Sequence, residues 1–276
     1  MIKAIPLLIL SIYLLVSCGN GQPKEETDEA LMGEFDSIMI AQEKGPSIKY
    51  FYENMVKHIT FPSKDSLTIY ADIYETKEGP VKLLLCQQAG LIKCAYINTG
   101  MVLSHLGHNS MAIDPRSGGV AKNIQNSMSQ DAYELGLSTD YIDARPDIEA
   151  AIDYLYEING GVPIILVGSS YSASLSLIVG KDNPKVKAIA AFSPGEYLEG
   201  IEVYKELDSI QKPIFVTSSK LEISQTSQLI QNVDSAFVTH FKPNTEGVHG
   251  ARALWKETEG HKEYWKAFLL FLKNNG

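Results

Sequence analysis

The segment VGSSYSAS, residues 167–174, carries five hydroxyl side chains in eight positions. The apolar runs PIILV and LSLIV flank it, and this pattern predicts a turn from a buried strand into a buried helix. Gly168, Ser170 and Ser172 form the sequence G-x-S-x-S, a variant of the G-x-S-x-G turn that presents a nucleophilic serine at the carboxyl edge of a sheet. The turn needs small residues two positions before and after the nucleophile, and Ser172 is nearly as small as glycine. Ser170 is therefore the candidate nucleophile.

A serine nucleophile needs a histidine base, and in enzymes with this turn the histidine follows the last strand of the sheet. His249 lies in TEGVHGARALW, between the last predicted strand and the C-terminal helix, with Gly247 and Gly250 on either side of it. It is the base we predict. The spacing of His105 and His108 would suit a metal pair, but no third ligand is evident in the sequence, so no metal site is predicted.

The acid that orients the histidine is expected in the loop after PIFVTS, where TSSKLEISQT offers Glu222 as its only carboxylate. Glu196 in SPGEY follows the preceding strand and remains the alternative. Asp234 and Glu246 are poorer choices, because the first precedes the last strand and the second is too near His249 in the chain.

Two further segments are expected at the same edge of the sheet. Glu196 and Tyr197 are candidates for lining the pocket. Arg116 follows the strand NSMAID and either binds a carboxylate of the substrate or pairs with Asp114 or another acid; the structural ion pair is the favoured alternative.

The order of apolar segments predicts how these residues are positioned. HITFPSKDSLTIYADIYE alternates apolar and polar residues around a turn and predicts a hairpin. Strand-like runs then alternate with helical patterns: VKLLLC, NSMAID, VPIILV, VKAIAAF, PIFVTS and AFVTHF. Residues 145–158 place their apolar side chains on one helical face. We therefore predict an α/β fold over residues 46–276, with a mainly parallel sheet between two layers of helices.

The first eighteen residues, MIKAIPLLILSIYLLVSC, resemble an export signal: Lys3 precedes an apolar stretch that is too short to span a membrane. Its end, from Leu15 to Gly19, resembles the lipobox of bacterial lipoproteins, in which the cysteine, here Cys18, is lipidated. This predicts an exported, membrane-anchored lipoprotein that faces the periplasm or cell exterior; an ordinary secretory signal is the alternative. Residues 19–45 are polar and acidic and are expected to form a tether, with room for a short helix.

Composition narrows the classes of function further. The chain has 276 residues, 45% of them hydrophobic, which suits one domain with a large core. A formal net charge of −9 argues against a nucleic-acid partner. Cys86 and Cys94 are expected to be free thiols rather than a disulfide.

From about residue 46 to the end, the chain resembles an α/β hydrolase of the dienelactone-hydrolase-like group. The segments LLLCQQAG, AIDPRSGG, VGSSYSAS, AFSPGEY and EGVHG carry the resemblance. It implies acyl transfer from an ester without a cofactor, with an oxyanion hole formed by the backbone N–H groups of Gln88 and Tyr171. Relatives often have histidine where this chain has Gln87, a change that leaves both backbone donors in place.

The sequence thus predicts a serine hydrolase of small or polar esters, because the segment between AFSPGEY and KPIFVTS is too short for a large lid. A lipoprotein that uses the same fold to bind a ligand or a partner, without catalysis, remains the alternative.

Overall fold

The computed structural model describes residues 27–44, 48–75, 79–121 and 124–276. Its core is an eight-stranded sheet with the strand order β1-β2-β4-β3-β7-β8-β9-β10. Strand β2 pairs antiparallel with β1 and with β4, and the remaining neighbours pair parallel. The strands are β1 (Val56–Pro62), β2 (Thr68–Tyr74), β3 (Leu83–Cys86), β4 (Ser110–Asp114), β7 (Ile164–Ser169), β8 (Val186–Phe192), β9 (Ile214–Thr217) and β10 (Val238–Phe241), with the two-residue strands β5 (Val120–Ala121) and β6 (Ile124–Gln125) forming a separate pair.

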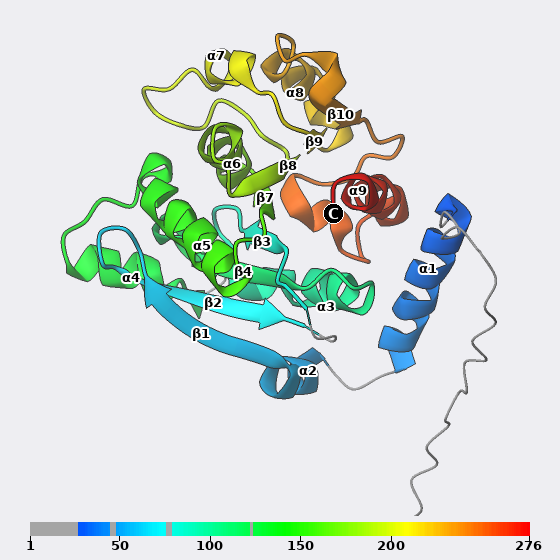
Figure 1. Cartoon of the computed structure of the whole chain (residues 1–276), viewed down its shortest axis with the longest axis horizontal. Coiled ribbons are helices and arrows are strands. Elements are labelled where there is room, and N and C mark those ends of the chain that lie inside the picture. The colour runs from blue at the N-terminus through cyan, green and yellow to red at the C-terminus, as the bar shows by residue number, and fades with distance from the viewer. Residues whose placement is uncertain (1–26, 45–47, 76–78, 122–123) are drawn as a thin grey trace, which may run out of the picture.

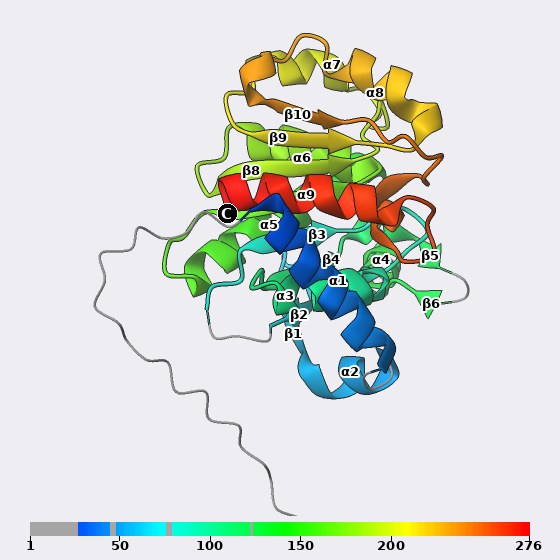
Figure 2. The same cartoon turned by 90° about the vertical axis from the view of Figure 1, so that its right-hand side faces the viewer.

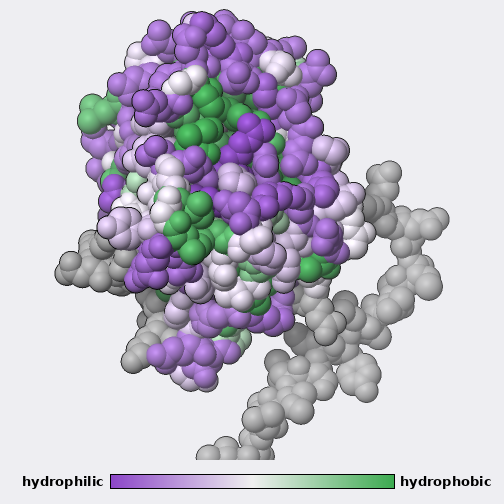
Figure 3. Space-filling view, turned by 90° about the vertical axis from the view of Figure 1, so that its left-hand side faces the viewer, coloured by the Kyte–Doolittle hydropathy of each residue, from purple (hydrophilic) through white to green (hydrophobic). Residues whose placement is uncertain are grey.

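Helices cover both faces of the sheet (Figures 1 and 2). One buried cluster joins the sheet to α4, α5, α6 and α8, and a second joins it to α1, α3 and α9. On the side of α5 and α6 the outer surface is mostly hydrophilic, with apolar side chains in patches (Figure 3). The helices are α1 (Asp28–Lys44), α2 (Ile48–Met55), α3 (Ile97–His105), α4 (Ser127–Glu134), α5 (Arg145–Ile158), α6 (Tyr171–Lys181), α7 (Val203–Glu206), α8 (Ile223–Leu229) and α9 (His261–Asn275).

The sequence pattern accounts for the centre of the sheet. Strands β3 and β7 are buried along their whole length, and they read as continuous apolar runs because helices cover both of their faces. The opening hairpin pairs Val56 with Tyr74 and Pro62 with Thr68, as its alternating pattern predicts. The predicted fold class, a mainly parallel sheet between helical layers, is confirmed. One short α-helix, α7, and the 3₁₀ turn Leu207–Ser209 that continues it lie between β8 and β9.

Residues 28–44, expected within a polar tether, form helix α1, which packs against the domain. Leu31 and Phe35 are four positions apart and therefore share one helical face, and both are buried in the cluster with α3 and α9. The ring of Phe35 lies 5.4 Å from that of Trp265, and Lys262 pairs with Asp36 at 2.7 Å. Helix α1 thus has a polar outer face and a short apolar stripe, Leu31 and Phe35, that packs against the domain.

Several expectations concern the N-terminus. Cys18, the lipobox-like segment and the rest of residues 1–26 lie outside the described residues, so the lipid anchor stays a prediction. None of the helices that the structure describes is both long enough and apolar enough to cross a membrane. Cys86 and Cys94 are both free thiols, and burial raises the pKa of each.

Candidate active site

Ser170 stands at the turn between β7 and α6, where the sequence predicts the nucleophile. Its backbone adopts φ +60° and ψ −124°, a region that costs about 1–3 kcal/mol and recurs at functional turns. Gly168 allows this turn, because a Cβ there would lie 2.4 Å from the carbonyl oxygen of Ser172. The strained turn places Ser170 directly at the N-terminus of α6 and at the carboxyl edge of the sheet.

Two neighbouring serines fix this turn from within. The hydroxyl of Ser172 lies 2.8 Å from the carbonyl oxygen of Cys86 on β3, to which it donates, and it accepts the N–H of Ser169 at 2.9 Å. The hydroxyl of Ser169 donates to Gln88 Oε1 at 3.1 Å and accepts the N–H of Ala251 at 2.8 Å. Both serines are buried and already bonded, so they hold the turn and leave Ser170 as the half-exposed hydroxyl.

The loop that carries His249 packs directly onto this turn. Gly250 adopts φ +74°, and a Cβ there would lie 2.2 Å from Gln88 Oε1 and 2.5 Å from Ser169 Oγ. Its N–H donates to Ser193 Oγ at 2.9 Å. Glycine at position 250 is therefore needed for the loop to approach closely enough to bring His249 beside the serine turn.

Glu222 is the carboxylate that meets His249, through a hydrogen bond between Glu222 Oε1 and His249 Nδ1. The other oxygen, Oε2, accepts three more hydrogen bonds: from Ser193 Oγ at 2.8 Å, from the N–H of Ser219 at 3.0 Å and from Ser219 Oγ at 2.8 Å. Burial raises the pKa of Glu222, but the hydrogen bonds from His249, Ser219 and Ser193 outweigh it and lower the pKa to about 2. Glu222 is therefore an anion that holds Nδ1 of the imidazole.

Glu196, the alternative acid, is engaged elsewhere. Its two carboxylate oxygens accept the N–H groups of Val203 and Tyr204, at 2.6 Å and 2.9 Å, at the start of α7. Of the two candidate acids, the structure brings Glu222 to the imidazole of His249 and places Glu196 as a cap on α7.

Tyr197 lies beside Ser170 and His249. Burial and the charge of Glu222 raise the pKa of Tyr197, and the neighbouring hydroxyl of Ser170 opposes that shift. The Tyr197 ring also stands edge-on to the imidazole of His249, with centroids 6.4 Å apart. Within the described residues no hydrogen bond joins Ser170 to His249. Catalytic hydrogen bonds are often loose without substrate and tighten in the complex.

Gln88 and Tyr171 are the expected oxyanion donors. Neither backbone N–H forms a hydrogen bond with another atom of the described chain, so both are available to an oxyanion. Tyr171 is fully buried and stacks on Tyr141, with ring centroids 4.4 Å apart. Gln87 is fully buried too, and its side-chain amide has no partner among the described residues.

Arg116 has a structural role. It is buried and pairs with Asp147 at 2.6 Å and with Asp65 at 2.6 Å, rather than with Asp114. Asp114 instead accepts the N–H of Lys93 at 2.6 Å. The structural ion pair expected from the sequence is therefore present, and it is made with acids other than Asp114. In the part of the chain that the structure describes, no group of three or more His, Cys, Asp or Glu side chains is placed to hold a metal ion.

Sequence reasoning missed the residues that support the site. Ser193 adopts φ +53° and bridges the acid to the histidine loop through its hydroxyl. Ser219 is the N-cap of the turn that carries Glu222. The sequence gives only a weak indication of these two serines. Each follows a predicted apolar strand, so it is expected at the carboxyl edge of the sheet, but nothing in the pattern predicts its role.

Comparison with known proteins agrees with this architecture at the level of the fold. No family model matches the chain, and no curated protein matches it. An esterase from Pyrococcus furiosus superposes with a TM-score of 0.62 at 17% identity, covering 83% of this chain and 96% of its own. A dienelactone hydrolase from Anabaena variabilis gives 0.58 at 13%, covering 79% and 97%, and the esterase domain of a Rhodothermus marinus protein gives 0.55 at 14%, covering 80% and 98%. Together with the strand order and the serine turn, these likenesses show that the chain has the α/β-hydrolase fold.

Proposed function

We propose that this protein is a serine hydrolase that cleaves small or polar esters through an acyl-enzyme on Ser170. His249 is the general base and Glu222 the acid that orients it. The contact between Glu222 Oε1 and His249 Nδ1 carries this proposal, because it leaves Nε2 as the nitrogen free to accept a proton.

The reaction follows from these positions. His249 Nε2 takes the proton of Ser170 as Oγ attacks the ester carbonyl, and the N–H groups of Gln88 and Tyr171 stabilise the developing oxyanion. The imidazolium then donates its proton to the departing alcohol. Water, activated by the same imidazole, attacks the acyl-enzyme and releases the acid and free Ser170. The anionic Glu222 stabilises the imidazolium in both halves of the reaction.

We also propose that the protein is exported and held at a membrane by lipid on Cys18. Several acyl chains together give stable anchoring, since each buried methylene contributes about 0.8 kcal/mol. Because α1 begins at Asp28 and its first buried residue is Leu31, residues 18–27 connect the anchor to the start of α1. Fully extended, they reach roughly 30 Å. Replacing Cys18 with alanine should move the protein from the membrane fraction to the soluble one; retention in the membrane would contradict the anchor.

The catalytic proposal is tested by hydrolysis of 4-nitrophenyl acetate by the domain without its first eighteen residues. Ser170→Ala and His249→Ala should each lower turnover by about 10³-fold or more, since members of a triad act as a unit. Thermal unfolding should stay close to that of the wild type. A folded wild type without turnover would favour the alternative, a binding protein on a hydrolase fold.

A further inference from the structure

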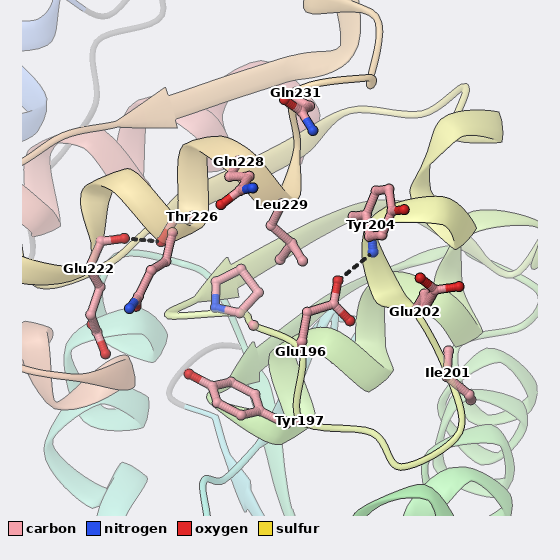
Figure 4. Close-up of a pocket in the computed structure, with 13 residues that line it drawn as sticks. Glu196, Tyr197, Ile201, Glu202, Tyr204, Glu222, Thr226, Gln228, Leu229 and Gln231 are labelled. Atoms are coloured by element: carbon pink, nitrogen blue, oxygen red, sulfur yellow. Dashed lines mark hydrogen bonds between the residues drawn. The ribbon is translucent and has the colours of Figure 1, made fainter.

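A groove of about 770 Å³ opens between α8 and the segment from the end of β8 to α7 (Figure 4). Glu222 and the hydroxyl of Tyr197 lie at one end of it; of the three candidate triad residues, Glu222 lines the groove, and its hydrogen bond to His249 joins that end to the candidate active site. Gln225, Gln228 and Gln231 line the side formed by α8 and the residues that follow it. Gln225 and Gln228 lie three positions apart on α8 and share a helical face, and Gln231 lies in the turn that follows the helix.

The charged groups of this groove are already engaged. Glu222 bonds to His249, the two oxygens of Glu196 accept backbone N–H groups, and Glu202 pairs with Lys205. The described residues that line the groove include no lysine or arginine. An anionic ligand would therefore meet carboxylates without a compensating cation, and a cationic ligand would compete with bonds already made.

Neutral hydrogen-bonding groups remain open to a ligand. No hydrogen bond in the described structure uses the side-chain amide of Gln225, Gln228 or Gln231. The side-chain amide of glutamine both donates and accepts hydrogen bonds, as hydroxyl groups do. The three amides therefore suit a ligand that carries several hydroxyl groups. Ile201 and Leu229 add apolar surface against which the C–H face of a sugar ring can pack.

We propose that this groove binds a neutral glycosyl group, the alcohol part of an O-acyl sugar whose ester reaches Ser170. This inference rests on the proposed esterase function and names its substrate class. An extended peptide that binds by strand addition fits less well, because that mode needs a free strand edge. Here helix α8 and a loop line the groove, and the nearby strand β9 is paired on both sides.

The test compares four acetyl esters that differ only in their alcohol. An acetylated neutral xylo-oligosaccharide should be cleaved with a kcat/KM at least about tenfold above those of an acetylated galacturonate oligomer, octyl acetate and an O-acetylserine tripeptide, given two or more additional hydrogen bonds. Equal or better cleavage of the anionic, the apolar or the peptide ester would overturn the proposal.

Variants of the groove test whether its glutamines cause the preference for the sugar ester. The double variant Gln228→Ala, Gln231→Ala should lower the ratio of kcat/KM for the sugar ester to that for 4-nitrophenyl acetate by about tenfold, mainly through KM. Gln211→Ala, which changes an exposed glutamine outside the groove, is the matched control and should leave the ratio unchanged. An unchanged ratio in the double variant would refute the role of the groove.

Binding separates this proposal from the esterase proposal. Calorimetric titration of Ser170→Ala with xylotetraose, which has no ester, should give a measurable affinity that the double variant in the Ser170→Ala background weakens about tenfold. If Ser170-dependent hydrolysis of 4-nitrophenyl acetate is absent while xylotetraose binds, the esterase proposal fails alone. If hydrolysis is present and xylotetraose does not bind, the groove proposal fails alone.

Discussion

Replacing Glu222 with glutamine changes one atom of the candidate site and should remove most of its activity. The loss follows from the backbone N–H of Ser219, because an N–H group can donate a hydrogen bond but cannot accept one. The backbone N–H of Ser219 donates to Glu222 Oε2 at 3.0 Å, so in Glu222→Gln the amide oxygen must occupy this position. The amide NH₂ group then takes the place of Oε1, opposite His249 Nδ1.

This exchange reverses the tautomer of the histidine. An NH₂ group facing Nδ1 can only donate, so Nδ1 becomes the acceptor and the imidazole carries its proton on Nε2. A protonated Nε2 cannot accept the proton of Ser170. Replacing a triad acid by its amide costs about 10⁴-fold in kcat, or about 5.4 kcal/mol, and we expect a loss of this size.

The measurement is kcat for 4-nitrophenyl acetate, with circular dichroism to show that both variants fold. Glu196→Gln is the matched control, because it makes the same chemical change in a carboxylate that caps α7. It should keep kcat within a few fold and lose about 1 kcal/mol of stability. Near-normal turnover by Glu222→Gln, together with a large loss in Glu196→Gln, would refute the assignment.

Three further predictions concern packing, pH and substrate size. Gly250→Ala should lower the melting temperature and turnover together in a thermal scan and ester assay, because its Cβ would lie 2.2 Å from Gln88 Oε1 at φ +74°; a wild-type melting temperature would show that the loop adjusts. The lowered pKa of Glu222, about 2 against an ordinary 4.5, stabilises the fold above about pH 4.5 and less as pH falls towards 2. Urea unfolding should therefore show the stability gap between wild type and Glu222→Gln narrowing over this range; a constant gap would contradict the sign. Acetyl and butyryl esters should have a higher kcat/KM than long-chain esters, since only α7 (Val203–Glu206) and the short 3₁₀ turn Leu207–Ser209 lie between β8 and β9; a preference for long chains would contradict an open site.

Hydrophobic patterning predicted the sheet, and the G-x-S-x-S motif together with the order serine, acid, histidine predicted the places of the candidate catalytic residues. Strands buried on both faces are short and wholly apolar, and parallel strands share one carboxyl edge. Ser170 and Glu222 follow the buried strands β7 and β9, and His249 follows the partly exposed edge strand β10, so the parallel order of these strands brings the three residues to one edge of the sheet. The choice between Glu222 and Glu196 needed coordinates, because it depends on which carboxylate is already bonded to backbone N–H groups.

Contacts between segments that are distant in the sequence could not be predicted from hydrophobic patterning. Among the side chains of α1 that the structure describes, Leu31 and Phe35 are the two buried in the core, and the surrounding sequence is polar, as in a tether. The edge-on contact between the rings of Tyr197 and His249 joins two loops through side-chain geometry that no periodicity encodes. The same holds for Ser193, whose φ of +53° is unusual for a residue other than glycine.

Covalent labelling tests the central claim, that Ser170 is the nucleophile, most directly. A fluorophosphonate probe added to the folded domain should attach once, and peptide mass spectrometry should place it on Ser170. Ser170→Ala should abolish labelling, whereas Ser174→Ala, which removes a buried hydroxyl bonded to Gly195, should still be labelled. Labelling that survives in Ser170→Ala, or a folded wild type that is never labelled, would contradict the account.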